Sequence, residues 1–445
     1  MSPRILPRPE HIISRKDIDP DALKVLYRLK TQGYLAYLVG GGVRDLLLAR
    51  RPKDFDIGTS AHPSAVKRLF RNCFVIGRRF RLCHVRFGQK VIEVSTFRRQ
   101  APAEEGETLI RRDNTFGTPE EDAFRRDFTV NALFYDIASF SVIDYVGGLD
   151  DLQKRVIRAI GDPVVRLRED PVRMLRAVAL AARLGFTIDR DTSEAIHVLR
   201  GEIVKSSPAR LLDELYKILR QGASRKTFEM LHEHGLLAYM LPEADEAIRE
   251  QPERLLGSLG RLDDYRNAGL AGPDDLTGAL LLGTLLVPLG VPLRHAQAAA
   301  TEREAPARGD VRGEMAALGA EEDDGLAAST SALSLPFARR DADRLRLVLA
   351  AQSRLREVHS SPRVKHMLAG RGYLEEALRW MEIHGGVQGR ELAAHWRTLG
   401  AAEERMAADG EQEPAPEPAT EAAPRRRRRR RRRRQPPSGS SPAEP

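Results

Sequence analysis

The sequence predicts an α+β protein of several domains, with a small mixed-sheet head, an all-α neck and body, and a disordered C-terminal tail. Three observations predict this architecture. Strand and helix patterns alternate over the first 150 residues, helical patterns then run almost alone to about residue 400, and residues 406–445 are rich in Pro, Glu, Ala and Arg. At 445 residues the chain is also too long for a single compact core.

The predicted head covers residues 21–150 and follows an irregular arm at 1–20. Apolar residues recur at helical spacing at its start, and short apolar runs that end in glycine or polar residues then indicate strands. We expect helices at 21–32, 43–50 and 63–70, strands at 34–39, 55–57, 75–87 and 90–97, a polar loop at 100–119, and further strand-like pieces at 128–135 and 142–145.

The predicted helical part divides into a neck at 151–245 and a body at 246–405. Its amphipathic patterns predict helices, and a polar Gly/Ala/Glu-rich interval at 300–332 reads as a linker or insertion. Residues 276–293 lack charge and approach the length of a membrane-spanning helix. Because this stretch contains Pro and Gly and has no aromatic belt, we expect a buried helix instead. The expected helices lie at 171–184, 209–221, 224–234, 339–353, 373–384 and 389–399.

Charge and cysteine content set limits on partners and compartment. The net charge is +9, but residues 425–434 are ten consecutive arginines, and 72 basic residues less these ten leave 62 against 63 acidic ones. The basic character therefore comes from the tail, which is too polar to bury a core. The chain has two cysteines, Cys73 and Cys83. This low number, with an N-terminus that lacks an apolar signal region, predicts a cytoplasmic protein without disulfides or membrane contact.

The stretch GGGVRDLLLARRPKDFDIGT at 40–59 carries the first chemical signal. Asp54 and Asp56 lie two residues apart on a predicted strand and would point to the same face. Two such carboxylates can bind Mg²⁺ together with substrate phosphates, and a glycine turn lets backbone N–H groups approach a triphosphate. Each element alone is also compatible with an ordinary turn or a solvated loop. Their order and spacing favour nucleotide chemistry, although P-loop, kinase and dinucleotide-fold signatures are absent.

Glu93, in KVIEVSTF, is the candidate for a third carboxylate. It alternates with Val91 and Ser95 on one face of a predicted strand, where a lone acid is costly unless it is paired or binds a metal. The alternative is a solvent-exposed strand face. With the two aspartates upstream, the metal interpretation is favoured.

Four ordered stretches resemble a known family. GGGVRDLLL with KDFDIGTSAHP, EEDAFRRDFTVNALFYD at 120–136, DYVGGLDDLQKRVIRAIGDP at 144–163 and REDPVRMLRAVALAARLGF at 168–186 resemble motifs of bacterial class II nucleotidyltransferases. These enzymes belong to the polymerase β superfamily and comprise the poly(A) polymerases and the CCA-adding tRNA nucleotidyltransferases. The resemblance implies a nucleotidyltransferase head and weakens along the helical body; the polyarginine tail lies outside it.

The resemblance implies a role for each matching residue. Asp54, Asp56 and Glu93 would be catalytic metal ligands, for two Mg²⁺ or Mn²⁺ ions. Asp127 would contact the ribose, and the helix with Asp170 and Arg173 would contact the base. Three residues apart on one helix, these last two would share a face and could match a base edge. The implied nucleotide-binding residues are Gly41, Gly42, Arg44, Asp45, Arg126, Asp127, Asn131, Asp170, Arg173 and Arg176.

The shared motifs do not select the product, but the stretch VIGRRFRLCHV at 75–85 does. GRRFRL followed by HV resembles the signature of bacterial poly(A) polymerases. Arg78, Arg79 and Arg81 would then bind RNA or triphosphate. A flexible polyarginine tail would raise the local concentration of RNA without sequence preference, or contact other acidic partners. The alternative for the tail is a solvated extension without a role.

We therefore expect template-independent transfer of AMP from ATP to RNA 3′ ends, with release of pyrophosphate. Two alternatives remain open. One is CCA addition to tRNA, since both branches share the head motifs. The other is an RNA-binding protein with an inactive head, against which the presence of all three acids argues.

Overall fold

The computed structural model describes residues 2–77, 81–99, 115–272, 275–291, 335, 337–357, 359 and 361–410. The chain divides into two compact units, residues 1–396 and 397–445. The described part of the second unit, residues 397–410, is helical. The predictions for Arg78, Arg79, the loop at 100–114, the linker at 300–332 and the polyarginine tail lie outside the described residues.

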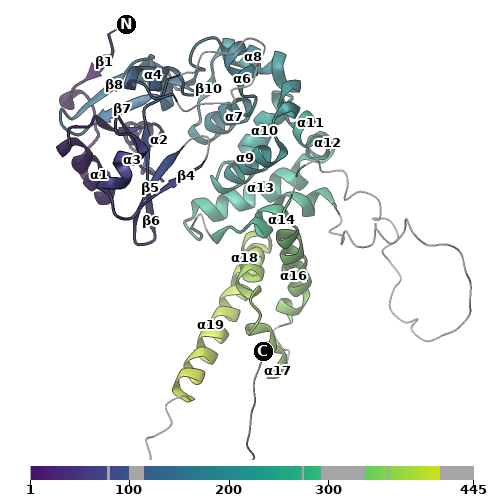
Figure 1. The fold of residues 1–445 in the computed structure, drawn as a ribbon. Coiled ribbons are helices and arrows are strands. Elements are labelled where there is room, and N and C mark those ends of the chain that lie inside the picture. The colour runs from purple at the N-terminus through teal and green to yellow at the C-terminus, as the bar shows by residue number, and fades with distance from the viewer. Residues whose placement is uncertain are drawn as a thin grey trace, which may run out of the picture. The chain divides into compact units, whose positions relative to one another are not determined.

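The head is built on an eight-stranded mixed sheet in the order β1-β8-β7-β2-β3-β6-β5-β4. Neighbouring strands pair antiparallel, except β3 and β6, which are parallel. Figure 1 shows these strands in the purple and blue N-terminal part of the ribbon. Their bounds are β1 (Arg4–Leu6), β2 (Ala36–Val39), β3 (Asp56–Thr59), β4 (Cys73–Ile76), β5 (Leu82–Phe87), β6 (Lys90–Thr96), β7 (Leu133–Asp136) and β8 (Ser141–Asp144).

Two predictions for the head are wrong. The arm is not wholly irregular, because β1 adds an edge strand beside β8. The single strand expected at 75–87 is two strands, β4 and β5, which pair antiparallel. Apolar residues continue through both strands, and Gly77, at φ +82, provides the break after β4. The remaining expected helices and strands of the head agree with the structure to within a few residues.

One face of the sheet is covered by α1 (Pro20–Thr31) and α3 (Pro63–Leu69). The Asp19 side chain accepts from the backbone N–H of Asp21 and Ala22, so that α1 begins with a good N-cap followed by proline. The buried face of α1 then packs into the same apolar cluster as the inward residues of β3 and β6. This packing fixes the strands that carry the acidic residues.

The opposite face is covered over only part of its width. Tyr37, Val39, Phe97 and Phe134 form a second apolar cluster there, together with Ala123 of α4 (Pro119–Phe124). Farther along this face, β4, β5 and β6 carry exposed or half-buried residues at alternate positions. We call the face of the second cluster the open face.

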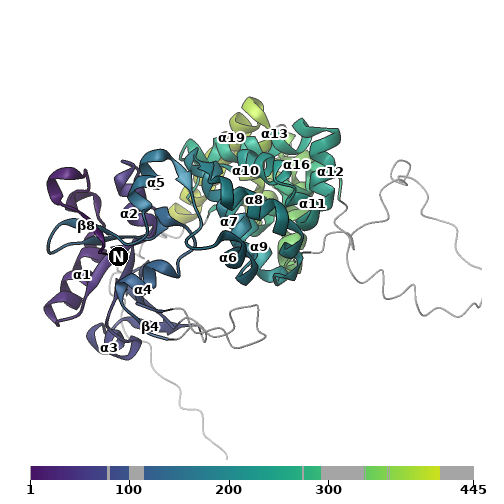
Figure 2. The same cartoon turned by 90° about the horizontal axis from the view of Figure 1, so that it is seen from above.

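The described part of the chain after residue 147 is mostly helical, as predicted, and contains two short strands, β9 (Val156–Ile157) and β10 (Thr187–Ile188). The helices α7, α10, α12, α13, α14, α16 and α18 pack in succession, and Figures 1 and 2 show them as the teal and green part of the ribbon. The helix bounds are α2 (Gly41–Leu47), α5 (Gly148–Lys154), α6 (Pro163–Glu169), α7 (Val172–Leu184), α8 (Arg190–Leu199), α9 (Pro208–Arg220), α10 (Ser224–Glu233), α11 (Leu237–Met240), α12 (Pro242–Glu250), α13 (Pro252–Asn267), α14 (Gly278–Leu289), α16 (Arg339–Arg356), α17 (Pro362–Ala369), α18 (Leu374–His384) and α19 (Gly386–Gly410).

The uncharged stretch that begins at Leu276 forms α14, whose residues 279–286 are buried within the helical part, as predicted. Its Gly283 allows close packing, since a Cβ there would lie 2.5 Å from the Trp380 ring and 2.6 Å from Leu345. Among the described residues, no helix has both the length and the apolar character needed to cross a membrane.

Candidate active site

The glycine turn brings the first turn of α2 against the segment that carries the aspartates. Gly40 has φ +73, a conformation that favours glycine, and it directly precedes α2. A Cβ at Gly42 would lie 3.3 Å from the carbonyl oxygen of Asp54. The glycines therefore let Gly41 and Gly42 line the same cleft as the acidic residues.

Arg44 is buried and fully engaged, which differs from the free phosphate donor that the sequence suggests. Its Nε and Nη2 donate to Asp45 Oδ1 at 2.8 and 2.6 Å, and its Nη1 donates to Asn131 Oδ1. Only 3% of Arg44 is exposed. Arg44 thus ties α2 to the RRDFTVN segment and positions both Asp45 and Asn131.

The acidic residues lie at the start of β3 and on its neighbour β6. Asp56 is the first residue of β3, and Asp54 precedes the strand, which begins later than the sequence suggests. Ile57 pairs with Val94, so Asp56 and Glu93 occupy corresponding positions on adjacent parallel strands. Burial and the nearby charge of Glu93, with a smaller effect of Asp54, raise the pKa of Asp56 to about 6, although Arg126 opposes the shift.

The donor chemistry of this group fits a divalent cation. The carboxylates act on one another as like charges, and a bound cation would relieve that repulsion. Asp54 is mostly exposed, and Glu93 Oε1 lies 3.3 Å from His84 Nε2. Within the described part of the chain, however, no three His, Cys, Asp or Glu side chains are gathered closely enough to form a ligand cluster. The metal assignment of Asp54, Asp56 and Glu93 stays a prediction.

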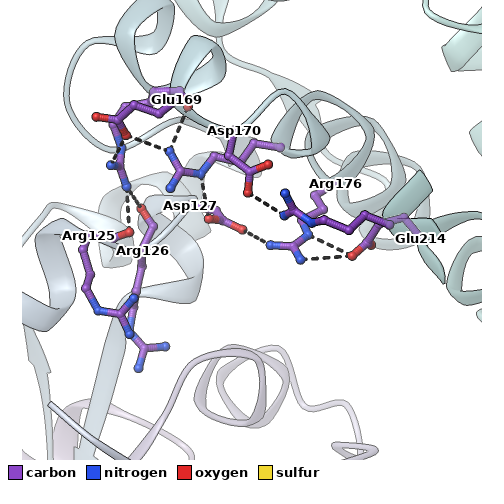
Figure 3. Close-up of polar contacts among 10 residues, drawn as sticks. Arg125, Arg126, Asp127, Glu169, Asp170, Arg176 and Glu214 are labelled. Carbon is purple, nitrogen blue, oxygen red and sulfur yellow. Dashed lines mark hydrogen bonds and ion pairs between the residues drawn. The ribbon is translucent and has the colours of Figure 1, made fainter. Parts of the chain in front are cut away.

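Asp127 is the centre of an ion-pair network that joins the head to the helical part (Figure 3). Its Oδ1 accepts from Arg173 Nε at 3.1 Å, and its Oδ2 accepts from Arg176 Nη1 at 2.8 Å. Arg176 also donates to Glu214 on α9, at 3.1 and 3.0 Å. Although burial acts in the opposite direction, Arg176 and Arg173 hold the pKa of Asp127 below its ordinary value.

The arrangement expected for Asp170 and Arg173 is wrong. Asp170 is the C-cap of α6, whereas Arg173 lies in the first turn of α7, so they do not share one helix face. Asp170 has an extended backbone, as is common for the residue before a proline, so α6 ends there and α7 begins after Pro171. Arg173 is buried and donates to Asp127, Glu169 and the Arg166 carbonyl oxygen. Asp170 accepts from Arg210 Nη2 at 2.8 Å through Oδ2, while its buried Oδ1 has no hydrogen-bond partner in the part of the chain that the structure describes.

Arg126 has a structural role that the sequence did not indicate. Its Nε and Nη2 donate to buried Asp122 at 3.2 and 2.9 Å, and its Nη1 donates to the Asn131 carbonyl oxygen at 3.3 Å. The same Asp122 also accepts from Arg125 Nε. Arg126 therefore holds the RRDFTVN segment in place and supplies the positive charge that acts on Asp56.

A cleft of about 860 Å³ lies between the head and the helical part. It is lined by most of the predicted residues, namely Gly41, Gly42, Arg44, Asp45, Asp54, Asp56, Asp127, Asn131 and Arg176. Four predicted residues, Glu93, Arg126, Asp170 and Arg173, do not line it. Nor does Arg81, which is exposed in the described structure and has φ +38.

The opposite wall of the cleft is basic, and apart from Arg176 its cations were not predicted from the sequence. Arg183 on α7 makes no hydrogen bond or ion pair within the described residues, and burial together with the nearby charge of Arg44 lowers its pKa. Its position could have been found, because it lies seven residues after Arg176 on the same face of α7. Lys217, Arg220 and Arg266 come from α9 and α13, and only the fold brings them here.

The far end of the cleft also contains unsatisfied polar atoms. Arg266 Nε and Thr277 Oγ1 are buried and have no hydrogen-bond partner among the described residues, and both residues line the cleft. Arg220 Nε donates to the Leu276 carbonyl oxygen at 3.2 Å. Buried donors without partners are uncommon in folded proteins and are frequently satisfied by a ligand or water.

The comparisons with known proteins agree with this organisation. Residues 36–158 match the poly A polymerase head domain, and residues 185–248 match the probable RNA and SrmB-binding site of polymerase A. A poly(A) polymerase I of Salmonella typhi is 50% identical over 275 residues, which is 59% of this chain and 59% of that protein. A CCA-adding enzyme of Lactobacillus johnsonii is 39% identical over 218 residues, or 48% of this chain and 54% of that protein.

Among solved structures, the CCA-adding enzyme of Bacillus stearothermophilus in complex with CTP is similar with a TM-score of 0.57. It is 28% identical, and the match covers 86% of this chain and 83% of that protein. The similarity therefore includes the mixed-sheet head and most of the helical part. The match to the curated Salmonella relative, in contrast, spans less than two thirds of that protein's length.

Proposed function

We propose that the chain is a template-independent poly(A) polymerase of the nucleotidyltransferase family that comprises the poly(A) polymerases and the CCA-adding enzymes, and its similarity to members of both groups supports this proposal. In this reaction the 3′-oxygen of RNA attacks the α-phosphorus of ATP. A new phosphodiester bond forms, the bond to the β-phosphate breaks, and pyrophosphate leaves. The proposed location of the enzyme is the cytoplasm.

We infer the type of reaction from one observation. Residues of opposite charge line the two sides of the same cleft. On the head side the cleft is lined by Asp54 and Asp56, with Arg44 already paired to Asp45. On the helical side five cations outnumber the single acid Glu214, and these cations are Arg176, Arg183, Lys217, Arg220 and Arg266. A nucleoside triphosphate carries several negative charges and would be attracted by the basic wall. The acidic side would be compatible with that ligand only when a cation neutralises it.

In the proposed site, Asp54, Asp56 and Glu93 hold divalent cations, Mg²⁺ or Mn²⁺. Such cations would lower the pKa of the attacking hydroxyl and stabilise the charge on the leaving group. The chain itself supplies position and charge. Arg183 binds the triphosphate beside the glycine turn, and the α2 backbone at Gly41 and Gly42 packs against it.

The sugar and the base would be bound on the helical side of the head. Asp127 lines the cleft and has its carboxylate fixed by two arginines, so it presents its remaining lone pairs in a defined direction to ribose hydroxyls. Asp170 lies beside this network without lining the cleft, and its buried Oδ1 accepts no hydrogen bond within the described residues, so in this scheme it would accept from an amino group such as that of adenine. Arg173 fixes Asp127 and acts as a positioning residue in this scheme.

The choice of poly(A) over CCA addition is supported by the sequence in two ways. The identity to poly(A) polymerase I is 50%, against 39% to the CCA-adding enzyme. The GRRFRL stretch followed by HV is the second support. We also propose that residues 21–150, 151–245 and 246–405 form head, neck and body, and that the polyarginine tail binds RNA.

The test supplies ATP, CTP, GTP and UTP singly, and then ATP and CTP together, to the protein with an unstructured RNA and with a tRNA that lacks its CCA end. Long A-tails on both RNAs are the expected result. A product that stops after C-C-A on the tRNA alone would establish the rival activity. No incorporation at all, with RNA binding retained, would establish the inactive-head alternative.

A further inference from the structure

A straight row of side chains continues the acidic site across the open face to the edge of the sheet. Asp56 on β3 corresponds to Glu93 on β6, Glu93 pairs with His84 on β5, and His84 pairs with Phe74 on β4. The four strands are neighbours in the sheet, and β4 is its edge. Residues in register on adjacent strands project to the same face, so these side chains share the open face.

The strand burial patterns confirm that this row faces away from the packed helices. On β5 and β6, Cys83, Val85, Ile92 and Val94 are buried in the cluster under α1 and α3, whereas the residues between them are more exposed. Phe74 is 53% exposed and Ile76 is 48% exposed. With Val75, which is 41% exposed, they give the edge strand three consecutive exposed apolar residues. A contiguous exposed apolar patch commonly marks a binding surface.

The chemistry of the row changes from the centre of the sheet to its edge. It begins with two carboxylates and continues with His84, whose Nε2 lies 3.3 Å from Glu93 Oε1. It ends with Phe74, and the guanidinium of the exposed Arg86 lies over the Phe74 ring, 5.3 Å from the ring centroid. Aromatic rings that stack bases and cations that bind the backbone are the usual components of single-strand binding surfaces.

We propose that Phe74, His84 and Arg86 form a track that guides the last nucleotides of single-stranded RNA to Asp56 and Glu93. This inference rests on the proposed function and names the path of its RNA substrate. Three strand spacings separate β3 from β4, or about 14 Å. That length accommodates roughly four stacked nucleotides at about 3.4 Å each.

The same track gives a role to part of the stretch at 75–85 that the acidic site and the cleft do not use. Leu82 and His84 lie on β5 with their side chains on the open face, while Cys83 and Val85 are buried in the core. His84 is therefore the residue of this stretch that joins the acidic row directly. It holds Glu93 and contributes a ring next to Phe74 in the row.

The test measures RNA binding and AMP incorporation separately in the full chain. The probe is a short oligoadenylate with 2-aminopurine near its 3′ end, whose fluorescence is quenched on stacking. Phe74→Ala is expected to abolish this quenching and to raise the KM for RNA about tenfold, as loss of one stacked base predicts. The KM for ATP should not change. Phe74→Trp should restore quenching, which separates stacking from a folding defect.

Tyr27→Ala is the matched control, because Tyr27 is a similarly exposed aromatic, at 42%, on α1, which covers the opposite face of the sheet. It should change neither the fluorescence quenching nor the KM for RNA or ATP. Arg86→Gln should lower the slope of log affinity against log salt by about 0.7, the value for one phosphate contact on a single strand. Unchanged quenching in Phe74→Ala, or an equal rise in the KM for ATP, would overturn the track. Because quenching needs no ATP, it tests the track even if the wild-type protein incorporates no AMP.

Discussion

Asp56 and Asp127 line the same cleft but occupy opposite electrostatic environments. Burial and other carboxylates raise the pKa of Asp56, whereas two arginines keep the pKa of Asp127 low against the effect of burial. Asp56 has only Arg126 to oppose the charges of two nearby carboxylates. Asp127, in contrast, is already neutralised by Arg173 and Arg176. Asp56 is therefore the acid for which we propose a bound cation, whereas Asp127 is the acid that joins the head to the helical part.

The largest expected effect is on activity and comes from Asp56→Asn. Loss of one acidic ligand should reduce AMP incorporation about a thousandfold or more. The free energy of unfolding without metal should rise by about 1 kcal/mol, because the amide is not repelled by Glu93 and Asp54. Urea unfolding in the presence of a chelator, with Asp191→Asn on the exposed start of α8 as control, measures this. A destabilised Asp56→Asn protein would show that the comparison is mistaken.

Asp127→Asn should have the reverse pattern, with the larger change in stability. It leaves Arg173 and Arg176 without their shared carboxylate, and breaking this partly buried network costs about 2 kcal/mol. Urea unfolding of Asp127→Asn should therefore show a clearly lower midpoint. Glu194→Gln is the control, since its ion pair with Arg190 is exposed and should contribute less than about 1 kcal/mol. Equal losses in the two variants would contradict a joining role for Asp127.

These two residues also show what the sequence could predict about the site. The DFD and RRD motifs identified both aspartates, and the alternation of strand and helix patterns identified the mixed-sheet head. The sequence could not assign their charge environments, because Arg173, Arg176 and Glu93 reach them only through the packing of α7 and β6. The separation of Asp170 from α7 was missed, although the helix was predicted to start at residue 171, because the family motif was interpreted as one helix that contains both Asp170 and Arg173.

The basic wall was missed for a different reason. Arg183, Arg220 and Arg266 lie on three helices, and each has the spacing of an ordinary solvent-facing residue in its own helix. Helical patterns predict that each helix exists but not which polar faces meet. The contacts among α7, α9 and α13 bring these cations to one cleft.

The pH dependence of the free energy of unfolding tests whether the pKa of Asp127 is lowered in the folded state. A carboxylate whose folded-state pKa is lowered stabilises the fold above its unfolded-state value and loses that effect as the pH falls through the folded value. For Asp127 the ordinary value is 3.8 and the shift is downward. The difference in stability between wild type and Asp127→Asn should thus be constant from neutral pH to about pH 4 and should shrink below it. A difference that already shrinks between pH 7 and 5 would place the Asp127 pKa above its ordinary value.

The smallest expected effect is that of Arg183→Gln, which tests the basic wall against the ion-pair network. Arg183 makes no ion pair within the described structure, and its lowered pKa indicates that burial opposes its charge, so the variant should fold at least as stably as wild type. Its KM for ATP should rise about tenfold, as expected for one lost charge-assisted contact to the triphosphate, while the KM for RNA stays the same. Arg190→Gln removes an equal charge from an arginine that is 86% exposed and should change neither constant. If Arg183→Gln instead destabilises the protein and leaves the KM for ATP unchanged, Arg183 belongs with Arg173 and Arg176 as a structural cation. The basic wall would then contribute to the stability of the fold, and Arg183 would not bind the triphosphate.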